Sequence, residues 1–379
     1  MLFTCSAHCT DPTHRHGRAA ATKRKAVTSV RAAAVTKAKR KTADLRIDVH
    51  CHYLNTAVAA KVAHLKPLQY EPSVIYANAL TNEVNSKQMK DRGAKLSSIE
   101  VRLRDMDKMG VDIQAVSPAP FQYYYWAEAS LGRTLSREVN EGIAALVAGN
   151  PDRFVGLGTV PLQNADMAVK ELEYASKVLG LRGVELNTNV NGLDLTDPSL
   201  KLEKFFRRAE ELEMPLFLHP VGFTQGQRLV DHYFNNVIGN PMDTTIAVSH
   251  LILDGVMARN PKLKVLVAHG GAYLAHYWAR MDHAHRARAD VRSVIKKPPS
   301  SYLAKMYFDT ITFDPEMLAN LVRKYGSDHV MLGTDYPYDM GEDDPVGHIR
   351  SVNGLSAADR QRIMGGNARK LFKIKIKGR

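Results

Sequence analysis

Two histidines, His50 and His52, lie two residues apart at the end of the segment that begins at Arg46. Side chains two apart on an extended strand leave the same face, so both imidazoles are expected to project together while Val49 and Cys51 point the other way. Two imidazoles on one face can bind one divalent cation, provided that further ligands come from elsewhere in the chain. By itself the pair is a weak indication of a metal site, because histidines this close also occur by chance.

Three more polar side chains end short apolar runs that are typical of buried strands, and they are His219, His269 and Asp335. Three neutral imidazoles and one carboxylate suit Zn²⁺, Mn²⁺ or Fe²⁺ and leave a coordination position for water or substrate. A metal-bound water would lose its proton more readily, with a pKa of about 7. A histidine beside that water, not needed as a ligand, is the natural general acid and base, and His269 is the candidate.

The elements that must position these side chains alternate between strands and helices. We count eight predicted strands, six of them followed by a recognisable helix, which favours an α/β fold of the (β/α)8 TIM barrel type. An open doubly wound sheet is the alternative. The barrel is favoured because its strand ends meet at one mouth, whereas an open sheet would spread the same polar residues along an edge.

Two irregular regions interrupt this alternation. Residues 53–97 follow the first strand with few regular signals, and we interpret them as a small loop-rich insertion over the pocket. Ser97 and Glu100 then form a capping-box pattern that predicts a helix with Ser97 at its N-cap. Residues 197–213 predict another helix, which opens on an Asp-Pro pair. The aromatic residues within 121–126 fit either the wall of a ligand site or the core.

The composition is that of a soluble globular protein, with 45% hydrophobic and 24% charged residues. No apolar run reaches the roughly 20 residues of a membrane helix, and no secretory signal opens the chain. Three cysteines, Cys5, Cys9 and Cys51, are too few for a disulfide framework and favour a reducing compartment. We therefore expect a cytoplasmic protein without membrane contact.

Residues 1–42 are expected to form a disordered basic tail ahead of a single domain at 43–379. The segment 1–46 contains eleven Lys and Arg and two Asp, and so accounts for nine of the formal net charge of +13. Three interpretations of the tail stay open: a dispensable extension, a transit peptide, or a basic arm for nucleic acid or another polyanion. Nucleic-acid binding is expected at most through this tail.

Five segments together resemble the motifs of the metal-dependent amidohydrolase superfamily. They are Asp48-Val-His-Cys-His52, Leu218-His219-Pro220, Ala268-His269-Gly270-Gly271, Gly333-Thr334-Asp335-Tyr336-Pro337 and Gly366-Asn367-Ala368. Within the superfamily the chain most resembles the branch typified by 2-amino-3-carboxymuconate-semialdehyde decarboxylase. The resemblance implies that one metal, zinc or alternatively manganese, is bound by His50, His52, His219 and Asp335. It also implies that His269 is the catalytic acid and base, with Asp335 beside it.

The resemblance further suggests which residues contact the substrate. It implies that Arg280 reaches across a homodimer interface to the substrate carboxylate. Arg92 is the nearest match to a second arginine of the branch, although its spacing differs by about one residue. Trp126, Phe223 and Glu185 are further candidates for substrate binding.

Two departures from the branch fall where the pocket is expected. Val221-Gly222-Phe223-Thr224 stands where the namesake enzyme carries a tryptophan, and Glu185 replaces a neutral residue. We therefore expect a decarboxylase, independent of organic cofactors, for an unsaturated or aromatic carboxylate of the muconate-semialdehyde or hydroxybenzoate type. The alternative is a hydrolase of an ester, a lactone or a C–C bond that uses the same site. A non-catalytic polyanion-binding protein is disfavoured, because it would need no acid/base histidine beside a metal.

Overall fold

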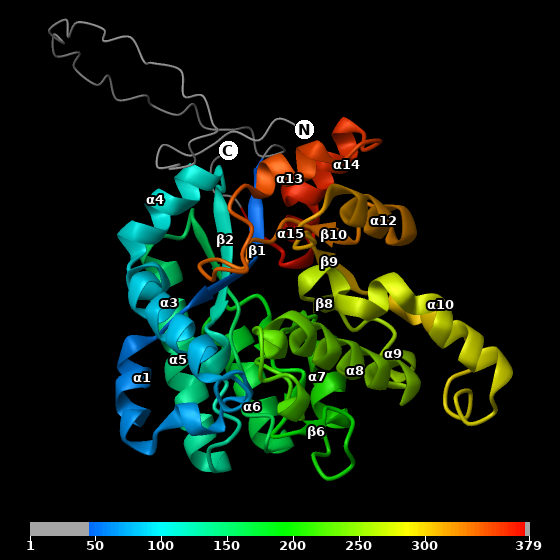
Figure 1. The fold of residues 1–379 in the computed structure, drawn as a ribbon, viewed down its shortest axis with the longest axis horizontal. Helices are drawn as coiled ribbons and strands as arrows, with labels where there is room; N and C mark the ends of the chain where they lie inside the picture. The colour runs from blue at the N-terminus through cyan, green and yellow to red at the C-terminus, as the bar shows by residue number, and fades with distance from the viewer. Residues whose placement is uncertain (1–44, 376–379) are drawn as a thin grey trace, which may run out of the picture. The chain divides into compact units, whose positions relative to one another are not determined.

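Two parallel sheets lie at the centre of the computed structural model, which describes residues 45–375 (Figure 1). The predicted tail, residues 1–42, lies outside these described residues. One sheet has the strand order β1-β2-β3, and the other has the order β10-β9-β8-β7-β4. The strands are β1 (Ile47–Tyr53), β2 (Ile113–Pro118), β3 (Phe154–Gly156), β4 (Val184–Leu186), β7 (Leu216–Leu218), β8 (Val265–Val267), β9 (Tyr307–Asp309) and β10 (Val330–Met331). The predicted α/β class with a parallel arrangement is confirmed.

Both edges of one sheet contact an edge of the other. Cys51 of β1 forms an isolated parallel bridge with Tyr336, beyond β10, and Gly158, beyond β3, forms one with Val184 of β4. At the first of these seams the His52 amide also donates to the Tyr336 carbonyl at 2.8 Å. The carboxyl ends of the two sheets are therefore held next to each other.

Helices occupy the connections between the parallel strands, as right-handed crossovers require, and in Figure 1 α5, α6, α8, α10 and α12 lie outside the strands. After residue 97 the helices are, in chain order, α4 (Ile99–Met109), α5 (Ala129–Gly149), α6 (Ala165–Lys177), α7 (Glu203–Glu211), α8 (Asn240–Leu253), α9 (Val256–Arg259), α10 (Ala272–Ala287), α11 (Pro299–Leu303), α12 (Pro315–Tyr325) and, following β10, α13 (Pro345–Ser351), α14 (Ala357–Gln361) and α15 (Asn367–Leu371). A short antiparallel hairpin of β5 (Asn189–Val190) and β6 (Leu193–Asp194) was not predicted. Within residues 45–375, no helix is long and apolar enough to cross a membrane.

The strands are buried on both faces. In β7, Leu216 and Leu218 pack into one apolar cluster, while Phe217 between them packs into a second cluster with Leu266 of β8. Alternate residues of a strand point to opposite faces, so both faces of the sheet have apolar partners. This double burial is why these strands appear in the sequence as continuous apolar runs.

Residues 53–97 are largely helical, which corrects the expectation of a loop-rich insertion. They form α1 (Thr56–Val62), the 3₁₀ turns 63–65 and 67–70, α2 (Pro72–Ile75) and α3 (Ala79–Ser97). Asn55 and Asn78 cap α1 and α3 by accepting a backbone N–H in the first turn. Of its nineteen residues α3 buries only Leu96, so it has no apolar stripe by which the sequence could have revealed it.

Two predicted helix starts are also wrong. Ser98, not Ser97, is the N-cap of α4, because α3 continues through Ser97. Asp197 stabilises a local turn in which its Oδ1 accepts the Ser199 amide at 2.8 Å, and α7 begins only at Glu203. In addition, the long helix α5 has no counterpart among the predicted elements. Asp314-Pro315 is the same pair of residue types and does begin a helix, α12, which buries Leu318, Leu321 and Tyr325. An Asp-Pro pair therefore fixes a helix start only where the following residues also pack.

Candidate metal centre

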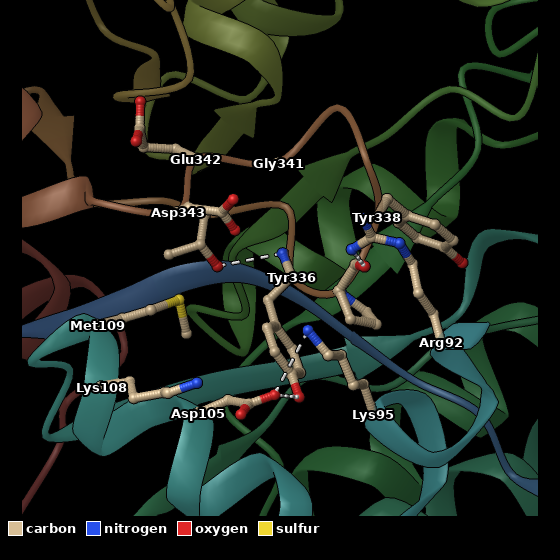
Figure 2. A pocket seen from close by; sticks show the side chains of 12 residues that line it. Arg92, Lys95, Asp105, Lys108, Met109, Tyr336, Tyr338, Gly341, Glu342 and Asp343 are labelled. Carbon is tan, nitrogen blue, oxygen red and sulfur yellow. Dashed lines mark hydrogen bonds and ion pairs between the residues drawn. The ribbon is translucent and has the colours of Figure 1, made fainter. Parts of the chain in front are cut away.

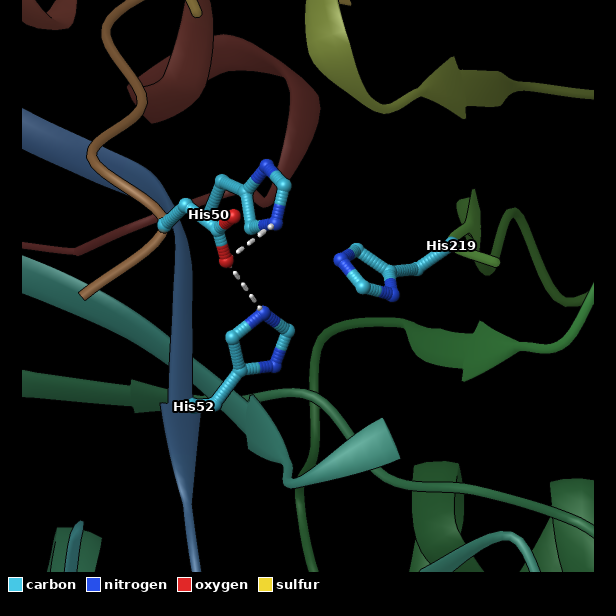
Figure 3. A group of neighbouring side chains, drawn as sticks. His50, His52 and His219 are labelled. Atoms are coloured by element: carbon cyan, nitrogen blue, oxygen red, sulfur yellow. Dashed lines mark hydrogen bonds and ion pairs between the residues drawn. The ribbon is translucent and has the colours of Figure 1, made fainter. Parts of the chain in front are cut away.

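The four predicted ligands meet at the carboxyl ends of their strands. His50 and His52 leave the same side of β1, and His219, directly after β7, faces them (Figure 3). Asp335 lies in the loop after β10. Each side chain offers one ligand atom, and these atoms all lie within 4.8 Å of one another, with all four residues buried. The convergence expected from the strand ends is present.

Hydrogen bonds fix which ring nitrogens face the centre of this group. The Nδ1 atom of His50 lies 2.7 Å from Asp309 Oδ2, and the Nδ1 atom of His52 lies 3.1 Å from the Pro118 carbonyl oxygen. These oxygens accept, so in the neutral form of each ring the hydrogen is on Nδ1 and Nε2 presents a lone pair that a metal can bind. The two Nε2 atoms lie 3.3 and 3.1 Å from Asp335 Oδ1.

This arrangement fits a bound cation. Two imidazole lone pairs and a carboxylate oxygen at about 3 Å repel one another unless positive charge lies between them. His219 adds to the same group, and neither of its ring nitrogens has a hydrogen-bond partner within residues 45–375. Three imidazoles and one carboxylate are a donor set for Zn²⁺ or Mn²⁺.

The pKa values show how strongly these buried groups interact. Burial alone would lower the pKa of His50, but the carboxylates of Asp335 and Asp309 outweigh it and raise that pKa to about 10. Burial and the neighbouring imidazoles hold the pKa of His219 well below its usual value. Burial would raise the pKa of Asp335, but His50 and the hydrogen-bonded imidazoles hold it well below its usual range. Asp335 therefore stays ionised, and the neighbouring imidazoles cannot all be protonated at once because their positive charges would repel one another.

His269 lies beside the four ligands. Its Nε2 is 3.5 Å from Asp335 Oδ2, and its ring centroid is 5.1 Å from those of both His50 and His219. Its side chain is 18% exposed, whereas those of His50 and His52 are fully buried. His269 therefore has access to a substrate that reaches the centre. Its φ of 56° and that of Asp335, 55°, are rare for residues with a side chain and mark a site held in place by its surroundings.

Asp309, the last residue of β9, was missed in the sequence. Its Oδ2 accepts the His269 amide at 2.9 Å as well as the His50 ring hydrogen, and its Oδ1 accepts the amides of Gly270 and Ile311. One carboxylate therefore orients a ligand and the segment that carries His269. In the sequence Asp309 directly follows the short apolar run Met306-Tyr307-Phe308, so the strand-end rule that found Asp335 would also have found it.

Glu185 lies inside β4 with its carboxyl group at the edge of the metal group. Its Oε1 is 3.6 Å from His52 Nδ1, and its side chain is fully buried. Burial raises the pKa of this carboxyl group well above its usual value, although the nearby His50 opposes the shift. The predicted substrate-binding residue therefore stands directly beside a ligand.

The two aromatic candidates, Trp126 and Phe223, lie in the segments around the metal group and not within it. Trp126 is half-buried and stacks on Tyr70, with ring centroids 4.8 Å apart, in a small pocket. Phe223 is half-buried, and its backbone N–H and carbonyl are both bonded to the side chain of Asn235. These two hydrogen bonds hold the loop after His219 in place. Within residues 45–375, no hydrogen bond or ring contact joins the Phe223 side chain to the metal group.

Arg92 lies on α3 beside Tyr338 (Figure 2). Its guanidinium donates to the Pro337 carbonyl oxygen, two residues after Asp335. It lines a cavity of about 360 Å³ that also contains Lys95, Lys108 and Asp105 in its wall. Tyr338 links this cavity to the metal group, because its ring centroid lies 5.3 Å from that of His52.

Arg280 lies on the exposed side of α10, away from these contacts. Within residues 45–375 its side chain has no hydrogen bond or ion pair. Tyr277 and Tyr273, one and two turns before it on the same face, are 66% and 41% exposed. The structure therefore places Arg280 on an exposed stripe with two aromatic residues.

Residues 47–374 match the family model described as amidohydrolase. The chain belongs to the amidohydrolase family. This amidohydrolase is 36% identical over 270 residues to the 2-amino-3-carboxymuconate-6-semialdehyde decarboxylase of Dictyostelium discoideum, an alignment that covers 71% of this chain and 75% of that protein.

Solved structures show the same fold. The 5-carboxyvanillate decarboxylase LigW from Sphingomonas paucimobilis is 26% identical and superposes with a TM-score of 0.77, covering 88% of this amidohydrolase and 100% of that chain. A dihydroxybenzoic acid decarboxylase from Polaromonas, solved with bound manganese and the inhibitor 2-nitroresorcinol, has a TM-score of 0.74 at 23% identity. It covers 87% of this chain and 97% of its own, and at this identity the likeness concerns the fold.

Replacing Asp309 by asparagine is expected to weaken metal binding about 10- to 100-fold, because an amide cannot hold the His50 ring hydrogen as a carboxylate does. Competition with a chelating dye of known zinc affinity measures the change. Asp290→Asn, an exposed carboxylate paired with Arg288, is the control and should leave the affinity unchanged. An Asp309→Asn protein with wild-type zinc affinity would show that His50 is oriented without this hydrogen bond.

Proposed function

We propose that this amidohydrolase is a metal-dependent decarboxylase that removes CO₂ from an unsaturated or aromatic carboxylate without an organic cofactor. The observation that supports it best is the meeting of His50, His52, His219 and Asp335 in one buried group with His269 beside it. Its relatives act on carboxylates of this kind, as their names state.

Each residue has a part in this proposal. His50, His52, His219 and Asp335 would hold one divalent metal, with Zn²⁺ as first candidate and Mn²⁺ as second. When bound, the metal supplies positive charge that orients and polarises the oxygens of the substrate. Asp309 and the Pro118 carbonyl keep the rings of His50 and His52 in place before the substrate arrives.

His269 would supply the proton that replaces the carboxylate. When the bond to the carboxylate breaks, its electron pair stays on the ring or chain carbon and spreads into the conjugated system. A proton must then reach that carbon as CO₂ leaves, and His269 Nε2, partly exposed beside Asp335, is placed to deliver it. Burial of the four ligands excludes bulk water from the reacting atoms.

We further propose that the two parallel sheets form one (β/α)8 barrel within a domain at 43–379. The two bridges that join their edges support this arrangement. Residues 53–97 would be an insertion that covers the mouth, since α2 and the 3₁₀ turns before it contact the segments that follow β2, β4 and β7.

A homodimer with Arg280 acting in the neighbouring site also belongs to the proposal. Aromatic residues and arginine are the residue types enriched at protein interfaces, and Tyr273, Tyr277 and Arg280 share one exposed face of α10. An arginine suits a carboxylate because its guanidinium makes paired, charge-assisted hydrogen bonds.

Hydrolysis of an ester, a lactone or a C–C bond is the second candidate. The buried Glu185 carboxyl group beside His52 favours it, because a carboxyl group with a raised pKa suits an acid that donates a proton to a leaving oxygen.

The two reactions leave different atoms in the product. For a substrate turned over in deuterated water we expect one deuteron on the carbon that bore the carboxylate and an equal amount of released CO₂, measured by mass spectrometry and CO₂ trapping. The physical reason is that His269 exchanges its proton with solvent and then protonates that carbon. Incorporation of oxygen from ¹⁸O-labelled water into a product acid, without CO₂, would assign the site to hydrolysis.

A further inference from the structure

Glu71, in the insertion, is a buried carboxyl group that the proposed chemistry does not use. It is the N-cap residue of α2, and it is only 6% exposed. Within residues 45–375 its carboxyl group has neither a hydrogen bond nor an ion pair. A buried polar group without a partner costs stability, so one is retained where it has a ligand to bind.

Glu71 lines a pocket of about 50 Å³, which is room for one small substituent and not for a whole substrate. Its walls come from three segments of the chain, with Tyr124 and Trp126, Asn189 and Asn191, and Val221 and Thr224. None of the residues that line it is a lysine or arginine. A second carboxylate group of a substrate, placed in this pocket, would therefore lose its hydration without gaining a positively charged partner.

The pocket lies next to the metal group. Val221, in its wall, is two residues after His219. Glu71 also lies close enough to Tyr338 to affect its ionisation, and the Tyr338 ring centroid is 5.3 Å from that of His52. A substrate with its carboxylate at the metal group would thus extend its far end toward Glu71.

The insertion that carries Glu71 is packed directly on the loop after His219. A side chain at Gly222, whose φ is 93°, would meet the Ser73 amide nitrogen at 2.6 Å and the Pro72 carbonyl carbon at 3.1 Å. Only glycine permits this approach. Glu71 is therefore held at a fixed position relative to the metal group.

We propose that Glu71 is a specificity-determining residue that accepts a hydrogen bond from a hydroxyl group at the end of the substrate remote from the departing carboxylate. The inference deepens the proposed function, on which it rests, by naming the substrate class as a hydroxylated unsaturated or aromatic carboxylate. A hydroxyl group fits better than an ether because it donates to Glu71, and better than an aromatic amine because its oxygen is the stronger acceptor for the buried Trp126 Nε1 hydrogen, which has no partner within residues 45–375.

The surroundings of the carboxyl group agree with an uncharged ligand. Burial raises the pKa of Glu71 to about 8, so that near neutral pH it is mostly protonated and pairs with a neutral hydroxyl group rather than with a cation. The other ionisable groups that line the pocket are the phenols of Tyr70, Tyr123, Tyr124 and Tyr125, and the phenol of Tyr338 lies close enough to Glu71 to be affected by its charge.

Calorimetric titration of the full-length, zinc-loaded protein tests the proposal with 4-hydroxybenzoate, 4-methoxybenzoate and benzene-1,4-dicarboxylate and with their 3-substituted isomers. In the wild type we expect one of the hydroxybenzoates to bind about tenfold more tightly than its methoxy analogue and than the dicarboxylate, because one hydrogen bond to a buried acceptor is at stake. Glu71→Leu should abolish this preference, whereas Glu71→Gln, which keeps an acceptor of the same shape, should retain it.

Glu83→Leu, an exposed glutamate on α3 of the same insertion, is the matched control and should leave all affinities unchanged. The tighter binding of the hydroxy compound than of the methoxy compound must be lost in Glu71→Leu, which removes the acceptor. Equal affinities in the wild type, a preference that survives in Glu71→Leu, tightest binding of the dicarboxylate, or no binding of any hydroxybenzoate would each overturn the proposal.

Quenching of Trp126 in a Trp278→Phe background places the ligand, because the chain has only two tryptophans and Trp126 lines the pocket. Release of CO₂ is measured separately. If CO₂ is released while the hydroxyl preference is absent, the role of Glu71 is wrong and the decarboxylase stands. If the preference is present while no carboxylate loses CO₂, the reaction is wrong and the pocket stands.

Discussion

His219→Ala is expected to leave the protein without metal and without activity, whereas His269→Ala should keep the metal and lose activity. His219 contributes one of four ligand atoms that lie within 4.8 Å of one another, and neither of its ring nitrogens is used elsewhere in residues 45–375. Loss of one ligand from a four-residue set opens the site to water and exchange. His269 lies beside the four ligands, and its removal should lower turnover about 10²- to 10⁴-fold because the acid and base is lost.

Elemental analysis of the purified variants measures the metal, and CO₂ release measures turnover. We expect about one metal ion per chain in the wild type and in His269→Ala. The exposed His283→Ala variant, on α10, serves as the matched control and should resemble the wild type in both respects. Unchanged metal content in His219→Ala would refute the ligand assignment, and loss of metal from His269→Ala would make His269 a ligand.

Mixing two inactive proteins, Arg280→Ala and His269→Ala, is expected to restore activity. If Arg280 acts across a two-fold interface, one of the two sites in a mixed dimer combines an intact arginine with an intact histidine. Random exchange between equal amounts then gives about a quarter of the wild-type activity, because half of the dimers are mixed and half of their sites are complete. The exposure of Arg280 with Tyr273 and Tyr277 on one face of α10 is the observation that motivates the test.

Subunit exchange is followed by native mass spectrometry of chains with different tags, so that the mixed dimer is counted directly. Arg286→Ala, an exposed arginine on the same helix, should remain active alone and needs no partner. Mixed dimers that form and stay inactive would place the action of Arg280 within its own subunit or nowhere in the reaction. A protein that stays monomeric would refute the dimer itself.

The positions of the candidate ligands could be predicted because they depend on a local rule. In parallel strands, the carboxyl ends meet, so a histidine or aspartate after an apolar run needs no knowledge of the rest of the fold to be placed. His219 and Asp335 were found in this way, and Asp309, which directly follows Tyr307-Phe308, satisfies the same rule although it was not among the candidates.

Features that depend on distant contacts could not be predicted. The helix α3 is polar on nearly all sides, and its position depends on contacts such as that of Arg92 with the Pro337 carbonyl, 245 residues away. Glu71 gave no signal at all, because a single glutamate in an irregular stretch is ordinarily exposed. Its burial appears only in the folded structure, in which the two residues after it, Pro72 and Ser73, pack against Gly222.

The distance along the chain between the ligands has a consequence for the order of folding. His52 and Asp335 are 283 residues apart in sequence, yet they meet where β1 contacts the loop after β10. Contacts between segments so far apart form late, because a long loop must close first. A growing chain therefore has no complete set of ligands until the last strand, β10, has been synthesised and the loop after it has come into contact with the first strand, β1. A metal bound there would stabilise the contact between β1 and the loop after β10, because it binds only the folded arrangement in which all four ligands are present.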